Sequence, residues 1–333
     1  MSAVNREIWV FGDYRNYFQN RVTLQLLAKA TDLAEKTDAR VCAVVIGREV
    51  GEYLREYVAH GADKVYAMTH PALESYSVET YSALLVSLAK KYQPETLLIG
   101  GTAFGREMAP RVAKRLGTGL TADCIGLDID AAGLLVQTAP SFGGNLLAKI
   151  ITPSHRPQMA TVRPGVFKEI PHDDNRIGEI VQLPYPKTIP RERVRLIRMD
   201  HTPPQGRRIE DAPVVVCGGR GMGSRQKFKK LYELARLTNG EVGATRPVVY
   251  AKWAEHDALV GQAGRQVKPQ VLFSFGISGA IQHTAALGHS DFIVAVNKNP
   301  NATMMKLADV AIVADASQVC SALIKVLKER IRN

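Results

Sequence analysis

Residues 271–283 read VLFSFGISGAIQH, an apolar run that ends at Gly276 and leads into a glycine-rich turn and a helical start. A short apolar run bounded by glycine is typical of a buried strand in a parallel sheet. Ligands of such sheets bind beyond the carboxyl ends of the strands, where free backbone N–H groups and the helix dipole can hold phosphate. A plain βα turn without a ligand is the alternative, because glycine spacing alone does not separate the two.

The α/β rhythm continues on both sides of this stretch. The other strand-like runs of the region are 213–219, 292–297 and 310–315, and a closing helical pattern extends from Ser317 to about Arg330. Four parallel strands within about 110 residues predict a compact, doubly wound domain at the carboxyl end of the chain.

The amino-terminal half repeats the rhythm and then departs from it. The runs that alternate with helical patterns are 8–11, 40–47, 64–68 and 96–101, and they predict a parallel sheet. The runs that follow without helices are 123–130, 134–138, 146–152 and 158–163. These predict antiparallel hairpins or an extension at the sheet edge.

Two proline-rich segments, 183–190 and 201–206, interrupt the pattern, because proline is excluded from core helices and strands. The basic, alternating segment 191–199 between them predicts a last strand. We therefore predict two α/β domains, 1–203 and 204–333. Both are doubly wound (Rossmann- or flavodoxin-like), and the first carries the antiparallel extension.

Composition excludes several classes of protein. No stretch approaches the ~18 consecutive apolar residues of a membrane helix, and the start lacks the layout of a signal or transit peptide, so we expect a cytoplasmic protein without a membrane span. Cys42, Cys124, Cys217 and Cys320 are far apart, which favours buried reduced thiols over disulfides or a metal site. The sequence shows no catalytic triad, paired carboxylates or metal-ligand cluster.

The net charge is +11, and residues 204–333 hold 18 Lys and Arg against 10 Asp and Glu. Nucleic-acid binding is disfavoured, because no aromatic-basic interleaving or known motif accompanies this charge. The basic run with Arg225, Lys227, Lys229 and Lys230 is expected to be a solvated helix face. Docking of an acidic partner through Lys227, Lys229 and Lys230 is a further hypothesis.

Three turns of the carboxyl-terminal domain hold candidate ligand residues. Arg220 lies in the glycine-rich segment 218–224 and can neutralise phosphate, although the spacing is a weak motif. Pro247 follows Arg246, so we expect a held guanidinium that can stack on a flat ring. Gln282 and His283 follow the glycine turn and are poorly placed for core packing, which favours contact with a polar ring over a solvated histidine.

These residues resemble a known family. Residues 276–283 (GISGAIQH), Gly288 and residues 293–297 (IVAVN) are similar to the signature of the alpha subunit of electron-transfer flavoprotein, the FAD-carrying half of a heterodimer. Residues 111–123 and 157–165 resemble the first domain of the same family. The resemblance implies a carrier of electrons between acyl-CoA-type dehydrogenases and other redox partners, active only within a complex with the beta subunit.

The resemblance also implies which residues contact FAD. They are Arg220, Thr245, Arg246, Gly261, Gln262, Ala263, Ser278, Gly279, Ala280, Ile281, Gln282, His283, Asn297 and Asp315. Ser278, Gly279 and Arg220 would hold phosphate, and Asn297 with Asp315 would bind ribose or adenine. Arg246 would lie by the isoalloxazine, and a charged His283 would face its pyrimidine carbonyl and stabilise reduced flavin. Ala263 departs from the family, which often has a threonine hydroxyl near flavin N5.

The first domain resembles the anaerobic-bacterial form of the family at 60–66, 70–74, 76–77 and 120–123. That form often bifurcates electrons from NADH between ferredoxin and an enoyl-CoA-type acceptor. Residues 141–145 are a candidate contact with the beta subunit or its cofactor, or else a plain hairpin turn. A different class also stays open: a regulatory or interaction module that binds AMP or ATP on the same fold without redox activity.

Overall fold

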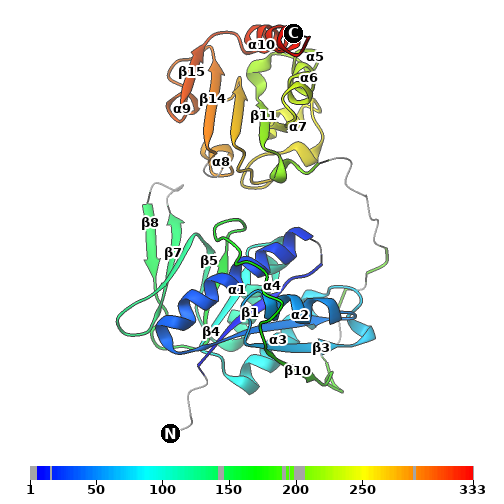
Figure 1. The fold of residues 1–333 in the computed structure, drawn as a ribbon, viewed down its shortest axis with the longest axis vertical. Coiled ribbons are helices and arrows are strands. Elements are labelled where there is room, and N and C mark those ends of the chain that lie inside the picture. Colours follow the sequence, from blue (N-terminus) through cyan, green and yellow to red (C-terminus); the bar gives the residue numbers. More distant parts are fainter. Residues whose placement is uncertain are drawn as a thin grey trace. The chain divides into compact units, whose positions relative to one another are not determined.

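The computed structural model describes residues 6–15, 17–141, 146–189, 193–194, 196–198, 207–287 and 290–332. The chain divides into two compact units, Met1–Met199 and Asp200–Asn333, and each builds its own parallel sheet (Figure 1). The predicted boundary between residues 203 and 204 lies outside the described residues.

The first unit contains a seven-stranded sheet in the order β10-β3-β2-β1-β4-β9-β5, and every neighbouring pair is parallel. Its strands are β1 (Glu7–Gly12), β2 (Arg40–Gly47), β3 (Lys64–Thr69), β4 (Thr96–Gly100), β5 (Leu120–Cys124), β9 (Gln158–Val162) and β10 (Glu179–Leu183). Its helices are α1 (Tyr17–Thr37), α2 (Gly51–Ala59), α3 (Val78–Tyr92) and α4 (Ala103–Leu116). A three-stranded antiparallel sheet is added by β6 (Gly126–Ile129), β7 (Leu135–Ser141) and β8 (Leu146–Ile150).

The predicted extension is confirmed for β6, β7 and β8 but wrong for 158–163. Strand β9 lies between β4 and β5 and is parallel to both. Strands β6, β7 and β8 lie between β5 and β9 in the sequence and form their own sheet. Local sequence pattern does not show that the chain then rejoins the parallel sheet as β9. Strand β10, which pairs with β3, was not predicted, and the described residues of 191–199 form no strand.

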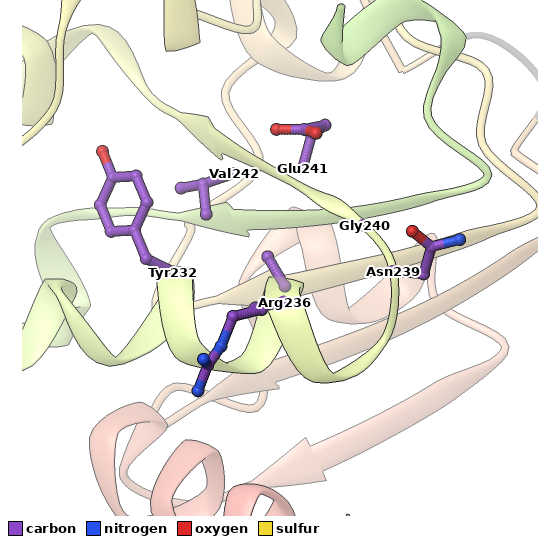
Figure 2. Close-up of a pocket in the computed structure, with 7 residues that line it drawn as sticks. Tyr232, Arg236, Asn239, Gly240, Glu241 and Val242 are labelled. Atoms are coloured by element: carbon purple, nitrogen blue, oxygen red, sulfur yellow. The ribbon is translucent and has the colours of Figure 1, made fainter. Parts of the chain in front are cut away.

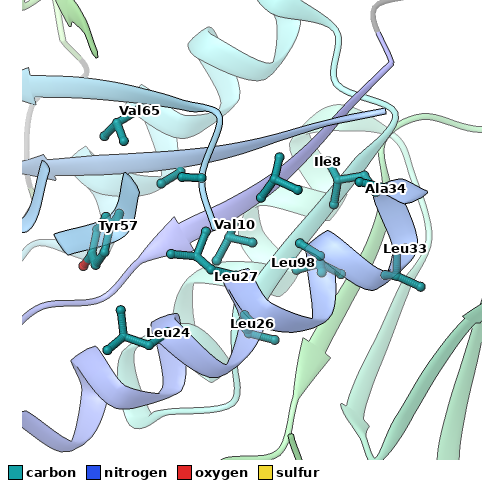
Figure 3. Packing of buried hydrophobic residues seen from close by; sticks show 14 of the residues in the cluster. Ile8, Val10, Leu24, Leu26, Leu27, Leu33, Ala34, Tyr57, Val65 and Leu98 are labelled. Atoms are coloured by element: carbon teal, nitrogen blue, oxygen red, sulfur yellow. The ribbon is translucent and has the colours of Figure 1, made fainter. Parts of the chain in front are cut away.

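Helices cover both faces of this sheet, and successive side chains of β1 point to opposite faces. Ile8 and Val10 pack against α1 and α2, while Trp9 and Phe11 pack on the opposite face against α3 and α4. Figure 3 shows the first of these layers, in which Leu27 of α1 lies close to Val10. Burial on both faces accounts for the continuous apolar runs.

The second unit contains a five-stranded parallel sheet in the order β12-β11-β13-β14-β15. Its strands are β11 (Val214–Gly218), β12 (Glu241–Ala244), β13 (Val271–Phe275), β14 (Phe292–Asn297) and β15 (Val310–Val313). Its helices are α5 (Arg225–Phe228), α6 (Lys230–Leu237), α7 (Arg246–Tyr250), α8 (Ile281–Thr284), α9 (Thr303–Lys306) and α10 (Ala316–Arg332). The predicted doubly wound fold is confirmed, but β12 was missed because its four residues include Gly243 and Ala244.

All four cysteines are free and buried, as predicted. Burial raises the pKa of the Cys217 thiol to about 12 and that of Cys320 to about 11, so these groups are neutral thiols. The described part of the chain holds no group of side chains suited to a metal ion. Among the same residues, no helix is long and apolar enough to cross a bilayer.

Candidate functional site

Each of the two parallel sheets has a point where its strand order reverses, and ligands of open α/β sheets bind there. In the first sheet this point lies between β1 and β4, and protein groups occupy it. Arg15 pairs with Asp13 at 2.8 Å, and its guanidinium lies 4.1 Å from the ring centre of Phe104. Thr102 donates to the other Asp13 oxygen at 2.9 Å. The candidate site therefore lies in the second unit.

In the second sheet the reversal lies between β11 and β13, where two glycine-rich turns meet through their backbones. The Gly219 N–H donates to the Phe275 carbonyl at 2.9 Å, and the Gly221 N–H donates to that of Gly276 at 3.0 Å. Gly276 has φ of 62°, and a Cβ there would lie 2.6 Å from the Gly221 Cα. This close approach requires glycine, and it leaves Arg220 exposed at the edge of the sheet.

The turn after β13 presents unpaired donors. No backbone carbonyl among the described residues accepts a hydrogen bond from the N–H of Ser278, Gly279 or Ala280. Gly279 has φ of 86°, and a Cβ there would overlap the backbone nitrogen of Met304. Helix α8 is a single turn, so the predicted dipole contribution is small. The free N–H groups themselves form the anion-binding feature.

His283 follows this turn in α8 and is only 6% exposed, so the prediction that it is unsuited to the core was wrong. Gln282 is exposed as expected. The Nδ1 of His283 donates to the Val260 carbonyl at 2.9 Å, because a carbonyl oxygen only accepts. Its Nε2 is buried without a partner in the structure. Burial lowers the pKa of His283, which opposes the positive charge expected of it.

The segment Gly261–Ala263 lies beside α8. The Gln262 N–H donates to the Gln282 carbonyl at 2.8 Å, and Gly261 is buried while Gln262 and Ala263 are exposed. Arg265 secures this loop through Glu210 at 3.1 Å and Asp257 at 3.2 Å. Sequence reasoning placed Val260 and Arg265 in this loop but assigned neither of them a role. Val260 acts through its backbone carbonyl, which no residue type signals.

Thr245 and Arg246 follow β12, on the other side of β11. The Thr245 N–H donates to the Gly218 carbonyl at 3.1 Å, and its side chain does not cap α7. Arg246 begins α7, and its side chain is exposed and forms no hydrogen bond with the described residues. Pro247 therefore fixes the backbone here, whereas the predicted hold on the guanidinium is absent from this structure.

Asn297 and Asp315 lie at the carboxyl ends of β14 and β15. The Asn297 side chain donates to the Ile277 carbonyl at 2.8 Å and accepts from the Asn299 N–H at 3.0 Å, so it positions the glycine turn. Lys298 pairs with Asp315 at 2.9 Å, and this hydrogen bond lowers the pKa of the carboxyl. Asp315 follows the outer strand β15, which is separated from β13 by β14.

Taken together, the predicted residues gather along one edge of one sheet. Free N–H groups and exposed arginines suit a phosphate-bearing ligand, and the buried Nε2 of His283 requires a polar partner. These features fit a nucleotide cofactor with a polar ring.

Comparison with known proteins agrees with this geometry. Residues 8–188 match the family described as "Electron transfer flavoprotein domain", and residues 208–288 match "Electron transfer flavoprotein FAD-binding domain". The chain is 44% identical to electron transfer flavoprotein subunit alpha of Thermoanaerobacterium thermosaccharolyticum over 97% of its length and 98% of that protein. It is 41% identical to the subunit alpha of Clostridium acetobutylicum over 96% of each.

Proteins named FixB also match, including that of Bradyrhizobium diazoefficiens at 38% identity over 98% of this chain and 89% of that one. The resemblance seen in the sequence is thereby confirmed. The chain belongs to the alpha subunits of electron transfer flavoproteins, and its second unit contains the FAD-binding domain of that family.

Proposed function

We propose that this subunit holds FAD at the carboxyl edge of the β11–β15 sheet, within a heterodimer with a beta subunit. In that complex it carries electrons between an acyl-CoA-type dehydrogenase and other redox partners. The observation that carries the proposal is the buried, unpartnered Nε2 of His283 beside the free N–H groups of Ser278 to Ala280. The cofactor itself supplies the electron-accepting chemistry.

The residues of this chain bind and orient the cofactor. The N–H groups of Ser278, Gly279 and Ala280 hold anionic phosphate oxygens, and Arg220 adds positive charge at the same edge. His283 offers Nε2 to the ring as an acceptor while Val260 fixes the proton on Nδ1. Ala263 has no hydroxyl, so this position contributes no side-chain hydrogen bond to flavin N5.

The antiparallel sheet supports the partnership with the beta subunit. Leu146 and Leu147 of β8 are exposed, the latter to 61%, although both are large and apolar. Exposed apolar side chains on an edge strand mark a surface that another chain covers. The predicted contact is the segment 141–145, of which Ser141 ends β7 and residues 142–145 lie outside the described residues.

The test is co-expression with the beta subunit, followed by cofactor extraction and a redox titration. We expect a yellow complex that loses FAD in the variant Ser278→Pro, which removes one N–H donor and leaves Gly279 and its left-handed conformation unchanged. Arg246→Ala should shift the flavin potentials, and Lys325→Ala on α10 is the control. A colourless complex that retains AMP or ATP in equilibrium dialysis would instead support the regulatory module.

Bifurcation is the finer proposal, and the resemblance of residues 60–66, 70–74, 76–77 and 120–123 supports it. The purified complex should then reduce ferredoxin with NADH only when the enoyl-CoA-type acceptor is present. Oxidation of NADH by that acceptor without ferredoxin reduction would reject bifurcation while leaving the electron-carrier role intact.

A further inference from the structure

One side of α5 and α6 carries cations that the fold does not use. Arg225, Lys229 and Arg236 are exposed, and none has an ion-pair partner within the described ranges. Arg225 lies in α5, Lys229 in the turn between the two helices, and Tyr232 and Arg236 in α6. The hollows they line share Tyr232, which places the four residues along one side of α5 and α6. We call these four residues the basic stripe.

The opposite side of the same helices is occupied. Leu231 and Leu234 pack in the core with Cys320 of α10. Lys230 donates to Ser321 at 2.7 Å and lies 3.4 Å from Ser317, and Glu233 pairs with Lys328 at 2.6 Å. The Lys230 ammonium is therefore bound by α10. Lys227, Lys229 and Lys230 do not form a single docking face, because Lys230 points toward α10.

Two open hollows meet at Tyr232 and extend the stripe. Arg225, Lys229, Tyr232 and Trp253 line one of about 380 Å³. Tyr232, Arg236 and Asn239 line the other, of about 400 Å³, and Figure 2 shows Tyr232 and Arg236 along the helix with Glu241 on the strand behind it. Tyr232 itself is 46% exposed.

We propose that the basic stripe is a docking surface for an acidic face of a protein partner. Arginine and tyrosine beside hollows are the composition of interface anchors, and a surplus of cations accelerates encounter with an acidic surface. Glu241 lines one hollow and Glu255 lines the other, where these carboxylates repel a continuous phosphate backbone but match a partner with mixed polar groups. The stripe shares no residue with the proposed FAD site.

The test measures binding of poly-L-glutamate to the complex with the beta subunit, at low and at physiological ionic strength. The stripe variant combines Arg225→Gln, Lys229→Gln and Arg236→Gln. The matched control combines Lys268→Gln, Lys306→Gln and Lys325→Gln, which change the net charge equally at exposed positions elsewhere. Tyr232→Ala tests the anchor without changing charge.

We expect the stripe variant to bind about tenfold more weakly and Tyr232→Ala about threefold more weakly, with a change below about twofold in the control. If both triple variants lost the same affinity for poly-L-glutamate, net charge alone would explain the binding and the proposal would be overturned. Tighter binding of a DNA duplex or of phosphatidylserine vesicles through the same cations would also overturn it. Flavin absorbance is recorded in parallel, so a failure of cofactor binding is seen separately.

Discussion

The Nδ1 of His283 lies 2.9 Å from the carbonyl oxygen of Val260, and this contact leaves Nε2 as the ring nitrogen that is buried without a partner. Since the carbonyl can only accept, the proton stays on Nδ1 and Nε2 keeps its lone pair. The loop that carries Gly261 to Ala263 thereby orients a side chain of α8. A backbone group, rather than a conspicuous side chain, organises the most buried polar feature of the site.

His283 makes one contribution to the pH dependence of stability. Its pKa in the folded state is lowered by burial, so the unfolded state binds more protons as the pH falls below about 6.5. The contribution of neutral His283 to the free energy of unfolding is therefore fully present above about pH 6.5, and it is lost as the pH falls toward the lower pKa of the folded state. Urea unfolding between about pH 8 and 5 should show a shallower decline in His283→Gln than in the native complex. Identical slopes would contradict the assignment.

Gly279→Ala should destabilise the second unit by about 2–4 kcal/mol, because the φ of 86° strains alanine and the new Cβ overlaps the Met304 nitrogen. Thermal unfolding of the complex measures the effect. Gly51→Ala is the control, since a Cβ at this helical position meets nothing within 4 Å. Gly51→Ala should leave the unfolding temperature unchanged or raise it slightly.

Asn297→Ala should weaken FAD binding about tenfold although its side chain is occupied by the protein, because the Ile277 carbonyl loses its donor and the turn loosens. Fluorescence titration of the deflavinated complex provides the measurement. Asn301→Ala changes an exposed amide nearby and should bind normally. If Asn297→Asp, which keeps the bond to Asn299 but not the donor, bound FAD as tightly as the native complex, the positioning role would be excluded.

Arg15→Ala should cost the first unit about 2–4 kcal/mol, since it leaves the buried Asp13 carboxylate without its cation and removes the contacts with Phe104 and Tyr76. Arg48→Ala removes a surface pair with Glu74 and should cost less than about 1 kcal/mol. Denaturant unfolding, monitored by a signal from the first unit, measures the loss of stability in both variants. Similar small losses would show that Arg15 is not an internal support.

Local pattern predicted the strands with continuous apolar runs, such as 40–47 and 271–275, because burial on both faces leaves a strong signal. It failed at β12, which is short and contains small residues, and at β9, whose direction depends on where the chain returns after an excursion. The same division holds within the site. Gly276 and Gly279 were found because a turn that needs positive φ selects glycine.

The sequence by itself determined the α/β class, the glycine turns and, through family signatures, the FAD-binding role of the second unit. Only the tertiary structure decided that His283 is buried with one nitrogen fixed by Val260, that Asn297 supports the Ile277 turn, and that Lys230 belongs to the core side of α6. The physical reason is the distance along the chain over which each kind of interaction acts. Residue type and periodicity report local backbone preference, whereas burial and hydrogen-bond partners depend on segments that meet only after the chain has folded.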